Sequence, residues 1–206
     1  NDLRSLDAGE CNGLAKRLHG SVDNFSNLGA VLANGDVFCS SLGVKSPVNV
    51  QDRQWFREVQ SVSGMTRGQF VIGKITGEPG IIFGYPIHDA AGVFQAAAFA
   101  ATNISWFDRL TARYGLPEGW TSVLFEANGD VISRYPDPDA WRGKALSDSS
   151  RQRLLAALAA KESRVVMAGV DGEERLFILE PVRLANNALV ASVSAPIGSI
   201  MRDIER

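Results

Sequence analysis

Two different spacings of apolar residues follow one another along this chain. Leucines recur in a polar background between Asp2 and Leu18, which predicts an amphipathic helix. Further on, short apolar runs of strand length are separated by turn sequences such as Asn-Gly and Thr-Gly-Glu-Pro. Helices are expected over residues 2–18, 51–62, 105–114, 148–161 and from 197, and strands over 28–32, 37–41, 69–75, 80–87, 93–102, 121–127, 131–135, 165–170, 175–182 and 188–194.

The order of these elements indicates the fold class. Strands 69–75, 80–87 and 93–102 follow one another with no helix between them, and the second half of the chain repeats this order. Parallel neighbours need a crossover segment, whereas antiparallel neighbours need only a turn. The sequence therefore predicts an α+β fold with antiparallel sheets flanked by helices, and it argues against a doubly wound parallel sheet.

An internal repeat divides the chain. Ala-Asn-Gly-Asp-Val occurs at residues 33–37 and again at 127–131, 94 residues later, and Pro-Ile at 86–87 is matched by Pro-Val at 181–182. Asn-Gly-Asp is a favoured hairpin sequence and could arise twice by chance. The nearly constant offset favours a duplicated module. We expect an N-terminal helical segment (1–27), a first module (28–115), a second module (116–196) and the start of an exit helix (197–206).

Composition narrows the function classes. The chain has 206 residues, 45% hydrophobic residues and a formal net charge of −2, so it can form a core and gives no sign of a nucleic-acid partner. No apolar run approaches the roughly 18 residues of a membrane span, and because the sequence begins at Asn1 we expect a fragment of a longer protein. The two cysteines, Cys11 and Cys39, could be separate thiols or one disulfide.

The sequence contains no motif that predicts catalysis. It lacks a nucleophile elbow, a Walker loop, a Rossmann glycine pattern and a His-Glu-x-x-His helix. His19 and His88 have no metal-ligand spacing, and Asp137 and Asp139 lie among prolines, as in a rigid surface turn. We expect no enzymatic activity, no metal and no cofactor in this fragment, and a small hydrolase is the least favoured reading.

One short segment does suggest binding. Arg53, Trp55 and Phe56 lie together at the expected start of a helix. A guanidinium group suits a carboxylate, and aromatic side chains can form the wall of an apolar pocket. The alternative is that Trp55 and Phe56 are core residues and that Arg53 forms a surface ion pair.

At these residues the sequence resembles the double Cache (tandem PAS-like) sensor domains of bacterial histidine kinases, diguanylate cyclases and chemoreceptors. The matching stretches are residues 32–40, 52–56, 84–92, 131–138 and 141–144. The resemblance implies two PAS-like modules behind an N-terminal helix. It also implies a membrane-distal first module that binds the ligand, a membrane-proximal second module that leads to a membrane helix, and a disulfide between Cys11 and Cys39.

The resemblance also implies a ligand site. In amino-acid-binding members an Arg-x-Trp-aromatic motif holds the ligand carboxylate, and acidic residues on later strands hold its ammonium group. Gly73 and Asn103 take the acidic positions here, so we expect a small organic anion, such as a carboxylate, in place of an amino acid. The candidate ligand-binding residues are Arg53, Trp55, Phe56, Lys74, Phe83, Tyr85 and Asn103.

The functional expectation is an extracytoplasmic sensor domain of a bacterial membrane receptor. Its parent would be a signalling enzyme anchored in the inner membrane, a histidine kinase above all, and would act as a homodimer. The sensor of a diguanylate cyclase or a chemoreceptor is an alternative. A structural or partner-binding ectodomain without a small ligand is another, and in that case the protein's own side chains would fill the pocket.

Overall fold

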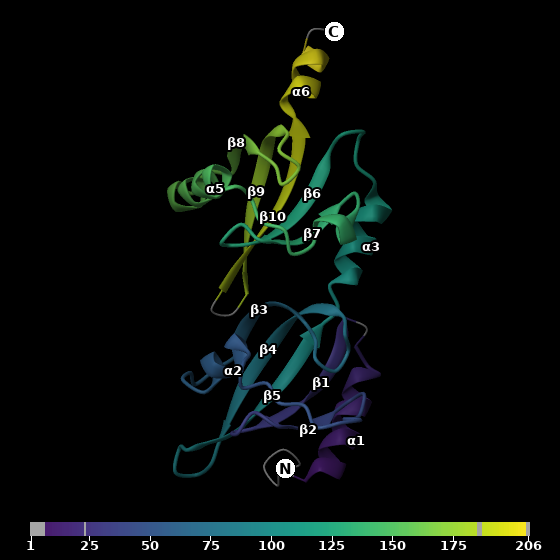
Figure 1. The fold of residues 1–206 in the computed structure, drawn as a ribbon, viewed down its shortest axis with the longest axis vertical. Helices are drawn as coiled ribbons and strands as arrows, with labels where there is room; N and C mark the ends of the chain where they lie inside the picture. The colour runs from purple at the N-terminus through teal and green to yellow at the C-terminus, as the bar shows by residue number, and fades with distance from the viewer. Residues whose placement is uncertain (1–6, 23, 185–186, 205–206) are drawn as a thin grey trace. The chain divides into compact units, whose positions relative to one another are not determined.

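The computed structural model describes residues 7–22, 24–184 and 187–204. The α+β class is confirmed, with two antiparallel five-stranded sheets and their helices (Figure 1). Residues 1–6 of the expected N-terminal helix, 185–186 and 205–206 lie outside the described residues. The helices are α1 (Ala8–His19), α2 (Gln54–Val59), α3 (Ser105–Tyr114), α4 (Pro138–Trp141), α5 (Asp148–Ala160) and α6 (Ile197–Ile204). The strands are β1 (Phe25–Leu32), β2 (Val37–Ser40), β3 (Thr66–Ile72), β4 (Pro79–His88), β5 (Phe94–Thr102), β6 (Thr121–Glu126), β7 (Val131–Tyr135), β8 (Arg164–Ala168), β9 (Glu174–Leu184) and β10 (Asn187–Pro196).

The two sheets have the same topology. The strand order is β2-β1-β5-β4-β3 in the first and β7-β6-β10-β9-β8 in the second. Each sheet is therefore made from a hairpin followed by a three-stranded meander whose last strand returns beside the first. The duplication inferred from the sequence is thus a duplication of the fold.

The repeated Ala-Asn-Gly-Asp-Val segment forms the same turn in both sheets. The side-chain amide of Asn34 donates to Asp36 at 2.8 Å, and that of Asn128 donates to Asp130 at 2.9 Å. The glycine between them has a φ of 86° at Gly35 and 89° at Gly129, a region that favours glycine. A single-residue bulge follows in each second strand, because Val31 pairs with Val37 and Ala30 with Cys39, as Phe125 pairs with Val131 and Leu124 with Ser133.

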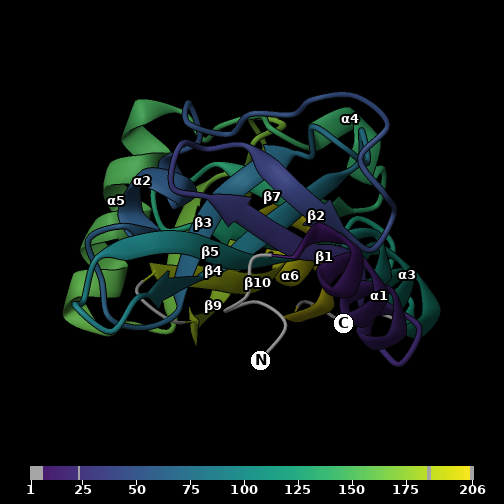
Figure 2. The same ribbon diagram turned by 90° about the horizontal axis from the view of Figure 1, so that it is seen from below.

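Both faces of the first sheet are covered. Consecutive residues of a strand point to opposite faces, and Ala30 and Val31 are both fully buried. Ala30 packs with Cys11 of α1, whereas Val31 packs with Trp55 of α2. Helices α1 and α2 therefore lie on opposite faces of this sheet, and Figure 2 shows α1 against β1 and β2.

The helix before each sheet is attached at the same place by different chemistry. Cys11 is the fourth residue of α1 and forms a disulfide with Cys39 of β2, with 5.8 Å between the Cα atoms. Asp108 is the fourth residue of α3, and it accepts hydrogen bonds from Ser133 of β7, the residue equivalent to Cys39, and from Arg142 at 2.6 Å. A covalent bond thus holds α1, and a partly buried ion pair with a hydroxyl holds α3.

Several element boundaries differ from the prediction. The chain divides into two compact units at Ile104–Ser105, about ten residues before the expected division, because α3 packs against β7 of the second unit. Strand β3 ends at Ile72, since Gly73–Glu78 forms a turn in which Gly77 N donates to the Gly73 carbonyl. Helix α4 was not predicted, and α2 begins at Gln54 with Arg53 at its N-cap.

The two turn glycines give a matched pair of variants. Replacing Gly129 with alanine places a side chain at positive φ, which costs about 1–2 kcal/mol in free energy of unfolding. Replacing Gly35 with alanine costs more, because its Cβ would meet Gln51 Cγ at 2.7 Å and Gln51 N at 3.0 Å, whereas the nearest atom to a Cβ at Gly129 is 3.4 Å away. Hydrogen exchange of each unit measures both values, and an equal or reversed order would contradict this account.

Removal of the disulfide should weaken only the first unit. Replacing Cys11 and Cys39 together with alanine opens a loop with a sequence separation of 28. The loop-entropy estimate for that separation is roughly 3–4 kcal/mol. Amide exchange should quicken throughout β1–β5 and stay unchanged in β6–β10. Exchange that quickens in neither sheet, or in both, would be inconsistent with two independent cores.

Candidate functional site

A cavity lies between α2 and the first sheet. Its volume is ≈ 40 Å³, and since one water needs about 10–15 Å³, it has room for a few waters or a ligand of a few heavy atoms. Most of the wall is aliphatic or aromatic. The lining residues are Asn27, Val31, Val37, Val48, Val50, Trp55, Gly73, Lys74, Ile75, Thr76, Ile82, Phe99 and Ala101.

A wider groove adjoins the cavity and gives it access to solvent. Val48, Lys74, Ile75 and Thr76 belong to both linings. The rest of the groove comes from the end of α1, the start of β1, the loop after β2, Glu78 and Asn103. The turn Gly73–Glu78 therefore separates the enclosed space from the open one.

Asn27 directs hydrogen-bond donors into the cavity. Its Oδ1 atom accepts hydrogen bonds from the hydroxyls of Ser40 at 2.8 Å and Ser41 at 3.0 Å. Each of these hydroxyl oxygens itself accepts a backbone N–H, from Leu42 and Leu28 respectively, so the hydroxyl hydrogens are free to donate to Asn27. The Asn27 amide nitrogen, in a side chain only 2% exposed, is left with its donors toward the cavity.

Trp55 contributes a second unused donor. Its indole Nε1 is buried and has no hydrogen-bond partner among the described residues. The opposite edge of the ring is occupied, because the Cε3 atom lies 3.0 Å from where a Cβ on Gly84 would be. Buried donors normally have an acceptor, so this unsatisfied N–H is an exception in a residue that lines the cavity.

Lys74 supplies the positive charge at the mouth of the cavity. Its Nζ donates to the Asn49 carbonyl at 2.8 Å and to Asp52 Oδ1 at 2.7 Å. Arg53 Nε lies 3.9 Å from the other oxygen of Asp52. One exposed carboxylate therefore partners two cations, and an incoming anion would compete with it for Lys74.

The two neighbouring cations lower the pKa of the Asp52 carboxyl. The hydrogen bond from Lys74 lowers the pKa of Asp52, and the charges of Lys74 and Arg53 add to the effect while partial desolvation opposes it. A lowered carboxyl pKa contributes stability above its ordinary value, and that stability is lost as the pH falls through the lowered value. The Asp52 carboxyl, with its lowered pKa, therefore stays ionised to a lower pH than an isolated aspartate does.

Replacing Lys74 with methionine should raise the pKa of Asp52 toward its ordinary value, since the hydrogen bond from Lys74 is the largest cause of the shift. An NMR titration of the Asp52 side-chain carboxyl carbon measures this value. Lys16 on α1 offers a control, and Lys16→Met should leave the titration unchanged. An unshifted Asp52 pKa in Lys74→Met would refute the pairing.

The structure brings together only some of the expected site residues. Trp55 and Lys74 line the cavity. Phe56 is fully buried in the core beside it, with its ring centroid 5.7 Å from that of Trp55. Arg53 lies at the helix N-cap, and its guanidinium donates to the Ile72 carbonyl at 3.2 Å, so it holds the end of β3 just before the turn that carries Lys74.

The other three expected residues lie elsewhere. Ile82 of β4 faces the cavity, so Phe83 and Tyr85, one and three positions later, lie on the opposite face of the sheet. Asn103 lines the open groove. Sequence reasoning missed Asn27, whose position on β1 becomes informative only once the strand register is known.

The described residues include neither a metal-ligand cluster nor a membrane-spanning helix. They contain no group of three or more His, Cys, Asp or Glu side chains placed to hold a metal ion. Among the described helices, none combines the length and the apolar character that crossing a membrane requires.

Comparison with known proteins identifies the fold. No protein-family model matches the sequence, and no curated protein matches it either. Among solved structures, the extracellular domain of rpHK1S-Z16, assigned as a histidine kinase, superimposes with a TM-score of 0.79 at 15% identity, over 97% of this chain and 82% of that one. The chain has the fold of a two-module sensor domain. The expected double Cache architecture is thus confirmed at the level of the fold.

Two further sensor domains were solved with amino acids bound. The ligand-binding domain of Mlp24 with asparagine gives a TM-score of 0.71 at 14% identity, over 100% of this chain and 82% of that one. The ligand-binding domain of the Pseudomonas fluorescens chemoreceptor CtaA with L-leucine gives 0.69 at 17% identity, over 97% and 82%. These identities establish a shared fold and leave ligand identity to the chemistry of the cavity.

Proposed function

We propose that this chain is the extracytoplasmic sensor domain of a bacterial membrane receptor and that its first unit binds a small organic anion. The observation that carries the proposal is the polar content of the cavity in that unit. The residues that line it include Lys74, Asn27 and Trp55, whose side chains all carry hydrogen-bond donors. Convergent donors in an apolar cavity suit a ligand that only accepts hydrogen bonds, such as a carboxylate.

The lining also argues against an α-amino acid. No Asp or Glu is among the residues that line the cavity. An ammonium group enclosed there would lack a counter-charge, which is costly in an apolar site. The CtaA and Mlp24 domains bind amino acids on a similar fold, so a change in polar residues would give the same architecture a different ligand class.

The second unit relays the signal in this proposal. The first unit is membrane-distal, the second is membrane-proximal, and α6 continues toward the membrane. A ligand shifts such a system only by binding one of its two packings more tightly. The parent is a signalling protein of the inner membrane, a histidine kinase above all, in which two copies pair. A diguanylate cyclase or a chemoreceptor is the alternative parent.

A structural ectodomain without a ligand is the second candidate function. The small size of the cavity favours it, because Trp55, Phe99 and the surrounding valines already fill most of the space under α2. In that case the cavity holds only water, and no small anion stabilises the first unit.

Calorimetric titration separates the candidates. Acetate, lactate and pyruvate should bind, whereas L-leucine and L-asparagine should not. Lys74→Met should weaken binding at least tenfold, about 1.4 kcal/mol, through loss of the charge. Asn27→Asp should abolish binding, because it replaces a donor with a carboxylate that repels the carboxylate of the ligand. Arg53→Ala should weaken binding by loosening the turn that holds Lys74.

The exposed Lys16→Met variant is the control and should bind as the unmodified chain does. Binding of amino acids alone would refute the anion proposal while leaving the sensor intact. No binding by either class would favour the structural ectodomain.

A further inference from the structure

The second unit has a position equivalent to the cavity of the first. In the first unit, Asn27 and Ala101 line the cavity and pair across β1 and β5. Their counterparts, Thr121 and Ser194, pair in the same way across β6 and β10, and their hydroxyl oxygens are 2.7 Å apart.

The turns beside the two positions also correspond. Gly73 N bonds the Glu78 carbonyl in the first unit, and Gly169 N bonds the Glu173 carbonyl in the second. The first turn carries Lys74, and the second carries Asp171.

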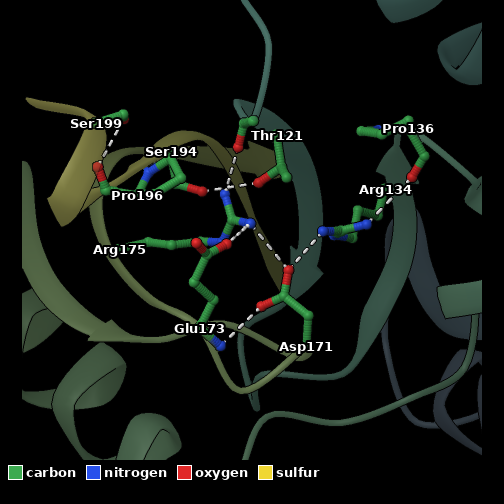
Figure 3. Close-up of polar contacts among 10 residues, drawn as sticks. Thr121, Arg134, Pro136, Asp171, Glu173, Arg175, Ser194, Pro196 and Ser199 are labelled. Carbon is green, nitrogen blue, oxygen red and sulfur yellow. Dashed lines mark hydrogen bonds and ion pairs between the residues drawn. The ribbon is translucent and has the colours of Figure 1, made fainter.

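Charged side chains occupy this position in the second unit (Figure 3). Arg175 lies on the core-facing side of β9 with Phe177, and Arg134 lies on β7 at the place of Ser40 in the first unit. Both arginines converge on Asp171 Oδ2, at 2.7 Å from Arg134 and 3.1 Å from Arg175. The guanidinium of Arg134 also lies 4.6 Å from the ring centre of Trp141.

From this arrangement we infer that Asp171 is a tethered ligand: its carboxylate takes, in the second unit, the part that a free anion takes in an anion-binding cavity. The two guanidinium groups form the anion site, and the turn between β8 and β9 delivers the anion as part of the chain. The second unit is therefore a self-occupied carboxylate site. This inference does not rest on ligand binding by the first unit.

The burial of the two arginines explains why this site must be filled. The side chains of Arg175 and Arg134 are only 5% and 8% exposed, and that of Asp171 is 19% exposed. Glu173 also contacts Arg175, but its side chain is half exposed. Of these two carboxylates, Asp171 contacts both arginines, whereas Glu173 contacts Arg175. Without it two like charges would face one another in a poorly hydrated space.

Donors in this site exceed the acceptors within reach. Arg175 Nη1 donates to the Gly119 carbonyl at 2.8 Å and Arg134 Nη1 to the Pro136 carbonyl at 3.3 Å. Even so, Arg175 Nε is buried without a hydrogen-bond partner among the described residues. The surroundings are those of an anion site, with Asp171 as its central acceptor.

Chemical rescue tests the inference. Asp171→Ala should lower the melting temperature of the second unit by roughly 10 °C or more. Formate, which matches the deleted carboxyl group, and acetate should restore much of that loss, because a ligand that binds only the folded state stabilises it. Chloride at equal ionic strength should restore little, and none of these salts should shift the unmodified chain differently from chloride.

Two matched variants identify the source of any rescue. Glu173→Ala removes the exposed carboxylate and leaves Asp171 in place, so formate should have no specific effect. Arg134→Gln combined with Asp171→Ala removes one of the two facing charges, so it should melt higher than Asp171→Ala alone and should lose the formate response.

If Asp171→Ala does not fold in chloride, its refolding yield in formate replaces the melting temperature as the measurement. The inference is overturned if formate stabilises Asp171→Ala no more than chloride does. It is also overturned if formate stabilises the unmodified chain and Glu173→Ala as much as it stabilises Asp171→Ala. Because these measurements concern the second unit, this inference can fail while the anion proposal for the first unit stands. The anion proposal can likewise fail while this inference stands.

Discussion

A polar hydrogen that folding removes from water needs an acceptor, and the interiors of both units are arranged around that requirement. In the first unit the Trp55 indole N–H is buried without a hydrogen-bond partner among the described residues, and Asn27 lines the same apolar cavity. In the second unit Arg134 and Arg175 lie at the equivalent position, and Asp171 accepts a hydrogen bond from each. The same sheet topology thus carries a site without a charged acceptor among the described residues that line it in one unit, and a site that holds a chain carboxylate in the other.

The sequence predicted the architecture well because its signals were local. Asn-Gly at residues 34–35 and 128–129 allows the positive φ that a tight hairpin needs. The adjacent apolar runs indicated strands, although several strands begin or end a few residues away from the predicted bounds. The repeat of this segment then predicted two modules of one design. Features without a clear local pattern were missed. They include the short helix α4 and the start of the Gly73–Glu78 turn.

The site was less predictable, because it depends on which face each strand residue occupies. Trp55 and Lys74 were recognised from residue type and from the resemblance to known sensors, and both line the cavity. Phe83 and Tyr85 differ from Ile82 by an odd number of positions, so they face the other side of the sheet. Asn27 and Asp171 carry no sequence signal, since their roles come from strand pairing and from distant partners such as Ser40 and Arg134.

The disulfide between α1 and β2 has a consequence for biosynthesis. Helix α1 precedes the strands it packs on, so its docking surface is made only after the helix itself has left the ribosome. The helix can be fixed covalently only once Cys39 has followed it into a compartment that oxidises thiols. Helix α3, held by Asp108, Ser133 and Arg142, has no such dependence. Oxidation is therefore needed to complete the first unit, whereas the second unit contains no cysteine and can mature in either redox environment.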